Sequence, residues 1–80
     1  MGMKIGECLQ GVILSNNKMA FIVANFGGEI ARIYRREMSP LQSDMVGMPI
    51  EAVVTEELDY CGKPILSNSA VYNRRQVASV

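Results

Sequence analysis

The sequence is dominated by short segments in which apolar and polar residues alternate, a pattern that indicates strands and not helices. The first segment places Leu9, Gly11 and Ile13 on one face, because successive side chains of a strand point to opposite sides. Val, Ile, Phe and Tyr recur in several of these segments, as is typical of strands. The pattern predicts five strands, over residues 7–15, 19–25, 29–34, 50–58 and 65–67.

Turn residues separate the predicted strands. Asn16 and Asn17 tolerate left-handed backbone and bond to their own main chain, and the glycine pair at 27–28 breaks the next strand. Gly11 lies inside the first strand, where we expect a bulge or a tight bend. Pro64 begins the last strand, which suits an edge or the mouth of a barrel.

The segment between the third and the fourth strand does not follow the strand pattern. Ser39 followed by Pro40 has the form of a helix start, with Ser as the cap and Pro at the first helical position. Leu41 and Met45 would then share one face of the helix, and Gly47 would end it. We therefore predict a short helix here.

Five strands with a short helix between the third and the fourth predict an all-β fold, an OB-type Greek-key barrel. A chain of 80 residues allows a single domain, here 1–80, with the barrel over about residues 4–67 and a tail at 68–80. The tail is compatible with a short helix capped by Ser67 or Ser69, and equally with a frayed end.

The absence of histidine restricts the chemistry of the chain. It removes the commonest general base and every histidine-dependent triad, and no pair of carboxylates stands out by its spacing. We therefore predict a protein that is not an enzyme and that uses no cofactor. Cys8 and Cys61 are too few for a zinc site, so no metal site is predicted. Both are expected to be reduced, partly buried thiols.

The charges balance in total but are unevenly distributed. A net charge of zero argues against strong non-specific binding of nucleic acid. Residues 1–36 carry five basic and two acidic side chains, whereas residues 37–59 carry six acidic and no basic ones. Such segregation can produce one basic and one acidic face. The apolar runs are too short to span a membrane and no secretory signal is found, so we expect a cytoplasmic protein without a membrane partner.

Five segments, in order, resemble the RNA-binding repeat of ribosomal protein S-one. Residues 4–13 (KIGECLQGVI) are similar to the start of that repeat, "vGdxveGxV", and residues 19–23 (MAFIV) to its "GAFV" strand. Residues 28–33 (GEIARI) resemble "GLvHiS", residues 46–54 resemble "vGdxvxvkV", and residues 59–67 (DYCGKPILS) resemble the closing "DxxxgkixLS". The resemblance covers residues 4–67 and implies the same barrel that the strand pattern predicts.

The resemblance also implies single-stranded RNA binding on the outer face of the second and third strands. Phe21 matches the aromatic of "GAFV", and base stacking on such a ring is worth about 1–3 kcal/mol per base. Tyr34 and Arg36 follow Arg32 at period two on the third strand. The residues assigned to RNA binding by the resemblance are Lys18, Met19, Phe21, Arg32, Tyr34, Arg36, Asp59 and Lys63.

The chain departs from the family at several of these positions. Lys18 stands where the family often has a second aromatic, and Met19 replaces a glycine. Arg32 replaces the family histidine, although arginine can also stack on a base and pair with phosphate. Asn68 takes the place of a basic residue, and Glu29 brings a negative charge. We therefore expect RNA binding to be weak and strongly dependent on salt.

Alternatives remain at this stage for single residues and for the function. A shift of one residue in register would bury Phe21 in the core, and Arg32 could be an ordinary solvated side chain. The first functional hypothesis is an RNA-binding module that works with a ribosome or an RNA-processing protein. The second is a protein-interaction adaptor, favoured by the acidic stretch and by six methionines. Met38, Met45 and Met48 could instead fill the core.

Overall fold

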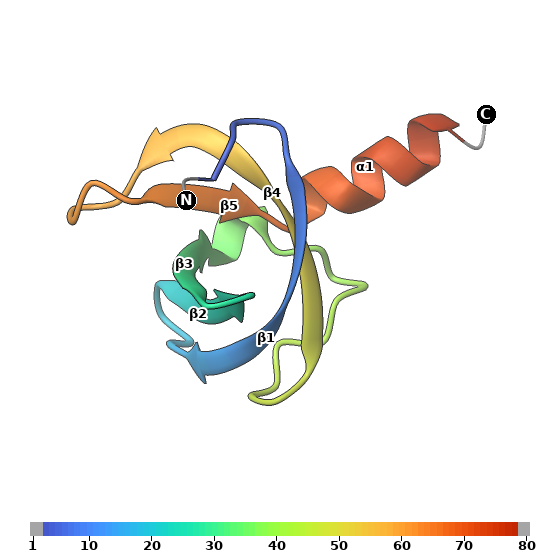
Figure 1. Cartoon of the computed structure of the whole chain (residues 1–80). Coiled ribbons are helices and arrows are strands. Elements are labelled where there is room, and N and C mark those ends of the chain that lie inside the picture. The colour runs from blue at the N-terminus through green and yellow to red at the C-terminus, as the bar shows by residue number, and fades with distance from the viewer. Residues whose placement is uncertain (1–2, 79–80) are drawn as a thin grey trace.

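The five predicted strands are present and form a closed barrel (Figure 1). The structure, a computed structural model, describes residues 3–78 and, in the last helix, the side chains as far as Asn73. The predicted bounds agree with the observed ones to within two residues, and those of the third strand are identical. The strands are β1 (Cys8–Asn16), β2 (Phe21–Phe26), β3 (Glu29–Tyr34), β4 (Pro49–Leu58) and β5 (Pro64–Ser67).

The strand order around the barrel is β1-β2-β3-β5-β4, with β4 returning to β1. Neighbours pair antiparallel except β3 and β5, which run parallel and meet at Arg32 and Ile65. The β2–β3 hairpin is paired without a break from Phe21 opposite Tyr34 to Phe26 opposite Glu29. The barrel wall is therefore most regular at this hairpin and most sparsely paired where β3 meets β5.

The core follows from the period-two alternation. Its members are buried side chains that point to the inside of the barrel, each large one worth about 1.5–3 kcal/mol when removed from water. Met3, Leu9 and Met38 pack against the cluster from its rim. The buried residues are Ile13, Ile22, Ala24, Phe26, Ala31, Ile33, Ile50, Ala52, Val54 and Leu66.

Gly11 is required by a close approach of two strands. A Cβ at this position would lie 2.3 Å from the carbonyl oxygen of Asn25 and 2.8 Å from Cδ1 of Phe26. The irregularity expected at Gly11 lies further along β1, where the register with β2 shifts between Ile13 and Ser15. Any larger residue at position 11 would push β1 away from β2.

The helical element between β3 and β4 does not lie at Ser39–Gly47, where the sequence predicts it. A short 3-10 helix, η1 (Arg35–Glu37), lies before it, and residues 38–48 have no regular structure. Ser39 caps only a single turn, by accepting a hydrogen bond from the amide of Leu41 at 3.1 Å. The physical reason is that Leu41 and Met45 are exposed, so no packing partner stabilises an apolar helix face here.

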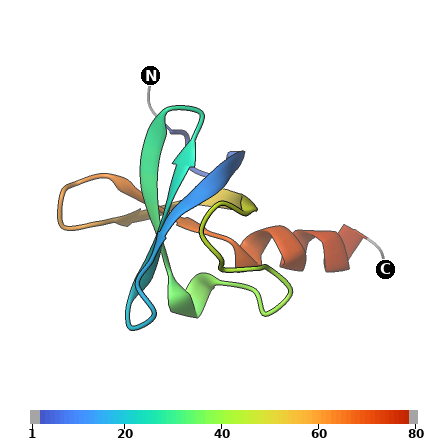
Figure 2. The same ribbon diagram turned by 90° about the horizontal axis from the view of Figure 1, so that it is seen from below.

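The chain after β5 forms a helix, α1 (Ser69–Ala78), which projects away from the barrel (Figures 1 and 2). Ser67 caps it through a 3.2 Å hydrogen bond from the amide of Ala70, as one of the predicted alternatives has it. Val71, in the first turn, is buried, and α1 packs on β4. None of the described helices is long and apolar enough to cross a membrane.

Candidate nucleic-acid interface

The outer face of β2 and β3 carries the aromatic and cationic residues selected from the sequence. Ile22 and Ile33 face each other across the hairpin and are fully buried, so their neighbours point outward. Phe21 accordingly lies on the outer face, half-buried, and not in the core. Ala20, two residues before Ile22, does not share its inward orientation and is exposed in the turn before β2.

Arg32 is held between two aromatic rings. Its Cζ lies 5.3 Å from the centroid of the Phe21 ring and 4.7 Å from that of Tyr60. Its Nη1 forms a 2.6 Å ion pair with Oδ2 of Asp59, and its Nη2 donates to the hydroxyl of Tyr60 at 2.9 Å. The guanidinium is thus fixed as one layer of a stack, Phe21–Arg32–Tyr60 (the Arg32 stack below), and is not an ordinary solvated side chain.

Asp59 organises the turn that brings Tyr60 to this face. Its side chain is 1 % exposed, and its Oδ1 accepts the amides of Cys61 at 2.8 Å and Lys63 at 3.0 Å. These amides, with the guanidinium of Arg32, hold the pKa of the Asp59 carboxyl below its ordinary value. The hydrogen bond to Asp59 in turn raises the pKa of Arg32. Asp59 therefore positions the site and leaves no carboxylate oxygen free to meet a ligand.

A second cation–aromatic pair lies beside the first. Arg36 belongs to η1 and not to β3, but its Cζ still lies 4.6 Å from the centroid of the Tyr34 ring. Nη2 of Arg36 also contacts both carboxylate oxygens of Glu57 at 3.1 Å. Both members of this ion pair are exposed, so its charges are screened by solvent.

The remaining predicted site residues lie in two turns. Lys18 and Met19 are exposed between β1 and β2, and Lys63 is exposed in the β4–β5 turn. Within the described residues, neither lysine forms an ion pair. Arg32 and Arg36 on the face are thus paired with two carboxylates, and the turns before β2 and β5 add two lysines that form no ion pair among the described residues.

Two contributors to the face were missed by sequence reasoning. Tyr60 is 81 % exposed, and an aromatic residue inside a turn next to Asp59 and Gly62 was the available signal. Glu57 could not be found, because its contact with Arg36 spans 21 residues. With Tyr60, three of the five aromatic residues of the chain lie on this face, the other two being Phe21 and Tyr34.

Asn68, which stands where the family has a basic residue, does not lie on the face. It is completely buried, where it accepts the amide of Ser39 at 2.9 Å and donates to the carbonyl of Glu51 at 2.7 Å. A basic residue could not form this pair of bonds in the same space. Asn68 is therefore a structural residue that ties the β3–β4 connection to the barrel.

Neither a metal site nor a related protein adds a further feature to the described part of the chain. No group of three or more histidine, cysteine or acidic residues is placed there to hold a metal ion. Among the described residues Cys8 and Cys61 form no disulfide, and both are exposed and not partly buried as expected. No protein-family model matches the sequence, and no significant match is found among curated proteins.

Proposed function

We propose that this chain is a single-stranded RNA-binding module of the S-one type, built on an OB-type barrel and acting in translation or RNA metabolism. The observation that carries the proposal is the Arg32 stack, in which a guanidinium is fixed between the rings of Phe21 and Tyr60. The strand order β1-β2-β3-β5-β4 is compatible with an OB-type barrel, whose second and third strands commonly bind oligonucleotides.

The geometry indicates how bases would be held. The ring of Tyr60 is stacked on Arg32 on one side and is largely exposed, so a base can extend the stack by one more layer. Arg36 over Tyr34 offers a second stacking position on the same face. Because these surfaces are flat rings and not hydrogen-bonding edges, we expect little preference for base sequence.

The charges indicate that the binding is weak. Arg32 and Arg36 are already paired with Asp59 and Glu57, which leaves Lys18 and Lys63 as the cations free to meet phosphates. Two phosphate contacts on a single strand correspond to a slope of about −1.4 for log K against log salt concentration, a weaker salt dependence than the sequence predicts. A ribosome or an RNA-processing protein as partner would compensate for this low intrinsic affinity.

An NMR titration with a short oligouridine at low salt tests the proposal. We expect amide shifts in β2, in β3 and in the turn at 59–63, and none if the proposal is wrong, even at millimolar RNA. Tyr60→Ala should weaken binding by about 5- to 100-fold, because one stacking layer is lost. The matched variant Tyr60→Phe keeps the ring, loses only the hydroxyl contact with Arg32, and should bind nearly as well.

A protein-interaction adaptor remains the second candidate, because of where the methionines lie. Met38 packs against the core as one alternative expected, but Met45 and Met48 are exposed and do not fill it. Flexible thioethers on a surface suit contacts with a partner protein. Recovery of a defined partner after nuclease treatment would favour this function, and loss of every partner on that treatment would count against it.

A further inference from the structure

The two arginines of the aromatic and cationic face meet their carboxylates in different surroundings. The side chain of Asp59 is 1 % exposed, and its partner Arg32 also donates to the hydroxyl of Tyr60 at 2.9 Å. In the second pair, by contrast, the side chains of Arg36 and Glu57 are 61 and 50 % exposed. Water and salt screen such an exposed pair, so it opens at little cost. Arg36 is therefore the arginine that can exchange its partner.

The contacts of Arg36 also favour an exchange. Only its Nη2 contacts Glu57, at 3.1 Å from both carboxylate oxygens, and its side chain forms no other hydrogen bond to the described residues. A guanidinium binds an oxyanion most tightly through two parallel N–H bonds, which this contact does not supply. The ring of Tyr34, whose centroid lies 4.6 Å from Cζ of Arg36, can keep the guanidinium on the face while its anion changes.

Arg36 adjoins the Arg32 stack. Tyr34, on which Arg36 lies, is the cross-strand partner of Phe21, the first ring of that stack. Side chains of such partners on one face of a sheet lie about 4.5–5.5 Å apart at Cβ. A single strand that extends from the stack along this row therefore brings a phosphate within reach of Arg36.

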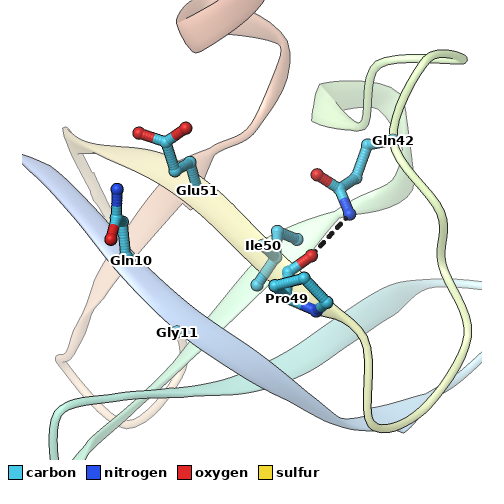
Figure 3. Close-up of a pocket in the computed structure, with 6 residues that line it drawn as sticks. All are labelled: Gln10, Gly11, Gln42, Pro49, Ile50 and Glu51. Atoms are coloured by element: carbon cyan, nitrogen blue, oxygen red, sulfur yellow. Dashed lines mark hydrogen bonds between the residues drawn. The ribbon is translucent and has the colours of Figure 1, made fainter.

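The hollows on the barrel surface offer a phosphate no better cation. The hollow of about 310 Å³ shown in Figure 3 has one charged side chain among its described lining residues, the carboxylate of Glu51. The hollow of about 490 Å³ has none among its described lining residues. The third, about 370 Å³, contains Arg35, but this guanidinium is held by Asp44 at 3.2 Å and by the carbonyl of Asn17 at 3.1 Å.

We propose that Glu57 is an internal competitor of the RNA backbone. In the free chain its carboxylate occupies Arg36, and in the complex a phosphate of the bound strand displaces it. The displaced carboxylate stays near the strand, because Glu57 belongs to β4, and it repels the phosphates there. Salt weakens the ion pair that has to open, which offsets part of the salt dependence of phosphate binding. The proposal rests on the RNA-binding function and states what limits its affinity.

Glu57→Gln tests the competition. The variant removes the carboxylate and keeps the size of the side chain, and because the pair is exposed the fold should be retained, which circular dichroism verifies. In the NMR titration with a short oligouridine at low salt, it should bind about two- to fivefold more tightly than wild type. Its slope of log K against log salt concentration should steepen from about −1.4 to about −2.1, as for one additional phosphate contact.

Glu56→Gln is the matched control. Glu56 is the neighbouring residue, is exposed and forms no ion pair among the described residues, and its substitution changes the net charge by the same amount. We expect it to leave the affinity and the salt slope nearly unchanged. In an Arg36→Gln background, Glu57→Gln should have no larger effect than Glu56→Gln, because the competition requires the guanidinium.

The outcomes separate this proposal from the function on which it rests. Equal gains from Glu57→Gln and Glu56→Gln, or a gain that persists without Arg36, would reflect net charge alone and overturn the proposal. If RNA binds wild type and Glu57→Gln with the same affinity and slope, the competition is absent but the RNA-binding function stands. If RNA shifts the amides of β2 and β3 in neither protein, the RNA-binding function is wrong and the competition with it.

Discussion

Two irregular segments of the barrel are each organised by one buried polar side chain, but from very different distances along the chain. In the β4–β5 turn, at residues 59–63, the organiser is Asp59, which accepts amides two and four residues ahead. In the β3–β4 connection, at residues 35–48, the organiser is Asn68, which lies 29 residues from the Ser39 amide that it binds. Arg35 adds a second long-range support, by donating to the carbonyl of Asn17 at 3.1 Å.

The distance of the anchor along the chain decides whether the shape of a segment can be recognised from its own residues. The turn carries its own anchor, so Asp59 and Gly62 suffice to indicate a turn between two strands. The anchor of the connection, Asn68, comes after β4 and β5 in the chain. The connection's own residues wrongly indicate a helix at 39–47. An irregular segment with a remote anchor should also lose more when that anchor is removed, because nothing local replaces it.

The largest expected effect is that of Asn68→Ala. The substitution leaves the buried amide of Ser39 and the carbonyl of Glu51 without their partner, and each such group costs about 1–3 kcal/mol. We expect the free energy of unfolding to fall by about 2–4 kcal/mol, measured by urea denaturation. Asn73→Ala, at an exposed position on α1, is the matched control and should change stability by less than about 0.5 kcal/mol.

Asn68→Asp separates the two bonds that the amide makes. The carboxylate still accepts the amide of Ser39 but can no longer donate to the carbonyl of Glu51. Because the carboxylate would also be buried beside that carbonyl, a loss smaller than that of Asn68→Ala would show that the bond to Ser39 contributes much of the stabilisation. If Asn68→Ala itself costs less than about 1 kcal/mol, the connection does not depend on its remote anchor.

Removing the carboxylate of Asp59 should have an intermediate effect on stability, and this effect should depend on pH. Because its pKa is lower in the folded chain than the ordinary 3.8, the unfolded chain takes up the proton more readily as the pH falls. The stabilisation by the carboxylate is therefore complete above the ordinary pKa of 3.8, and it is lost as the pH falls through the lower pKa of the folded chain. Asp59→Asn keeps an acceptor for the turn but loses the ion pair with Arg32.

Thermal unfolding at a series of pH values measures this effect. Wild type should have the higher Tm at neutral pH, and its advantage over Asp59→Asn should shrink below about pH 4. Asp44, whose pKa is also lowered, chiefly by its bond to Arg35, is more exposed, so Asp44→Asn should show a smaller difference of the same sign. A Tm difference between wild type and Asp59→Asn that stays constant with pH would contradict the role given to the carboxylate.

The smallest effect on stability is expected for the exposed ion pair that joins the β3–β4 connection to the end of β4. Arg36 of the connection pairs with Glu57, which stands just before the turn, and both side chains are exposed. Glu57→Gln should therefore change the free energy of unfolding by less than about 0.5 kcal/mol in a denaturation experiment. A clearly larger loss would mean that the turn and the connection stabilise each other through this contact. The two segments would then not be organised by separate anchors.

Much of the fold could be predicted because strand alternation is local. The pattern around Ile22 and Ile33 sets which side chains point inward, and it places Phe21, Arg32 and Tyr34 together on the outer face. The role of Asn68 could not be predicted, because a buried amide and a surface amide look alike in sequence. The exposure of Met45 could not be predicted either, since it depends on whether a partner element covers it.

The alternation of apolar and polar residues sets the five strands, their bounds to within two residues and their inner and outer faces, because these follow from a repeat of two residues along one segment. The order in which the strands pair, the contact of Tyr60 with Arg32 and the bonds of Gly47 and Met48 to Ile13 are visible only in the folded chain. These features depend on contacts between residues that are far apart in the chain, which no local pattern records. The Arg32 stack, which carries the proposed function, consists of such contacts.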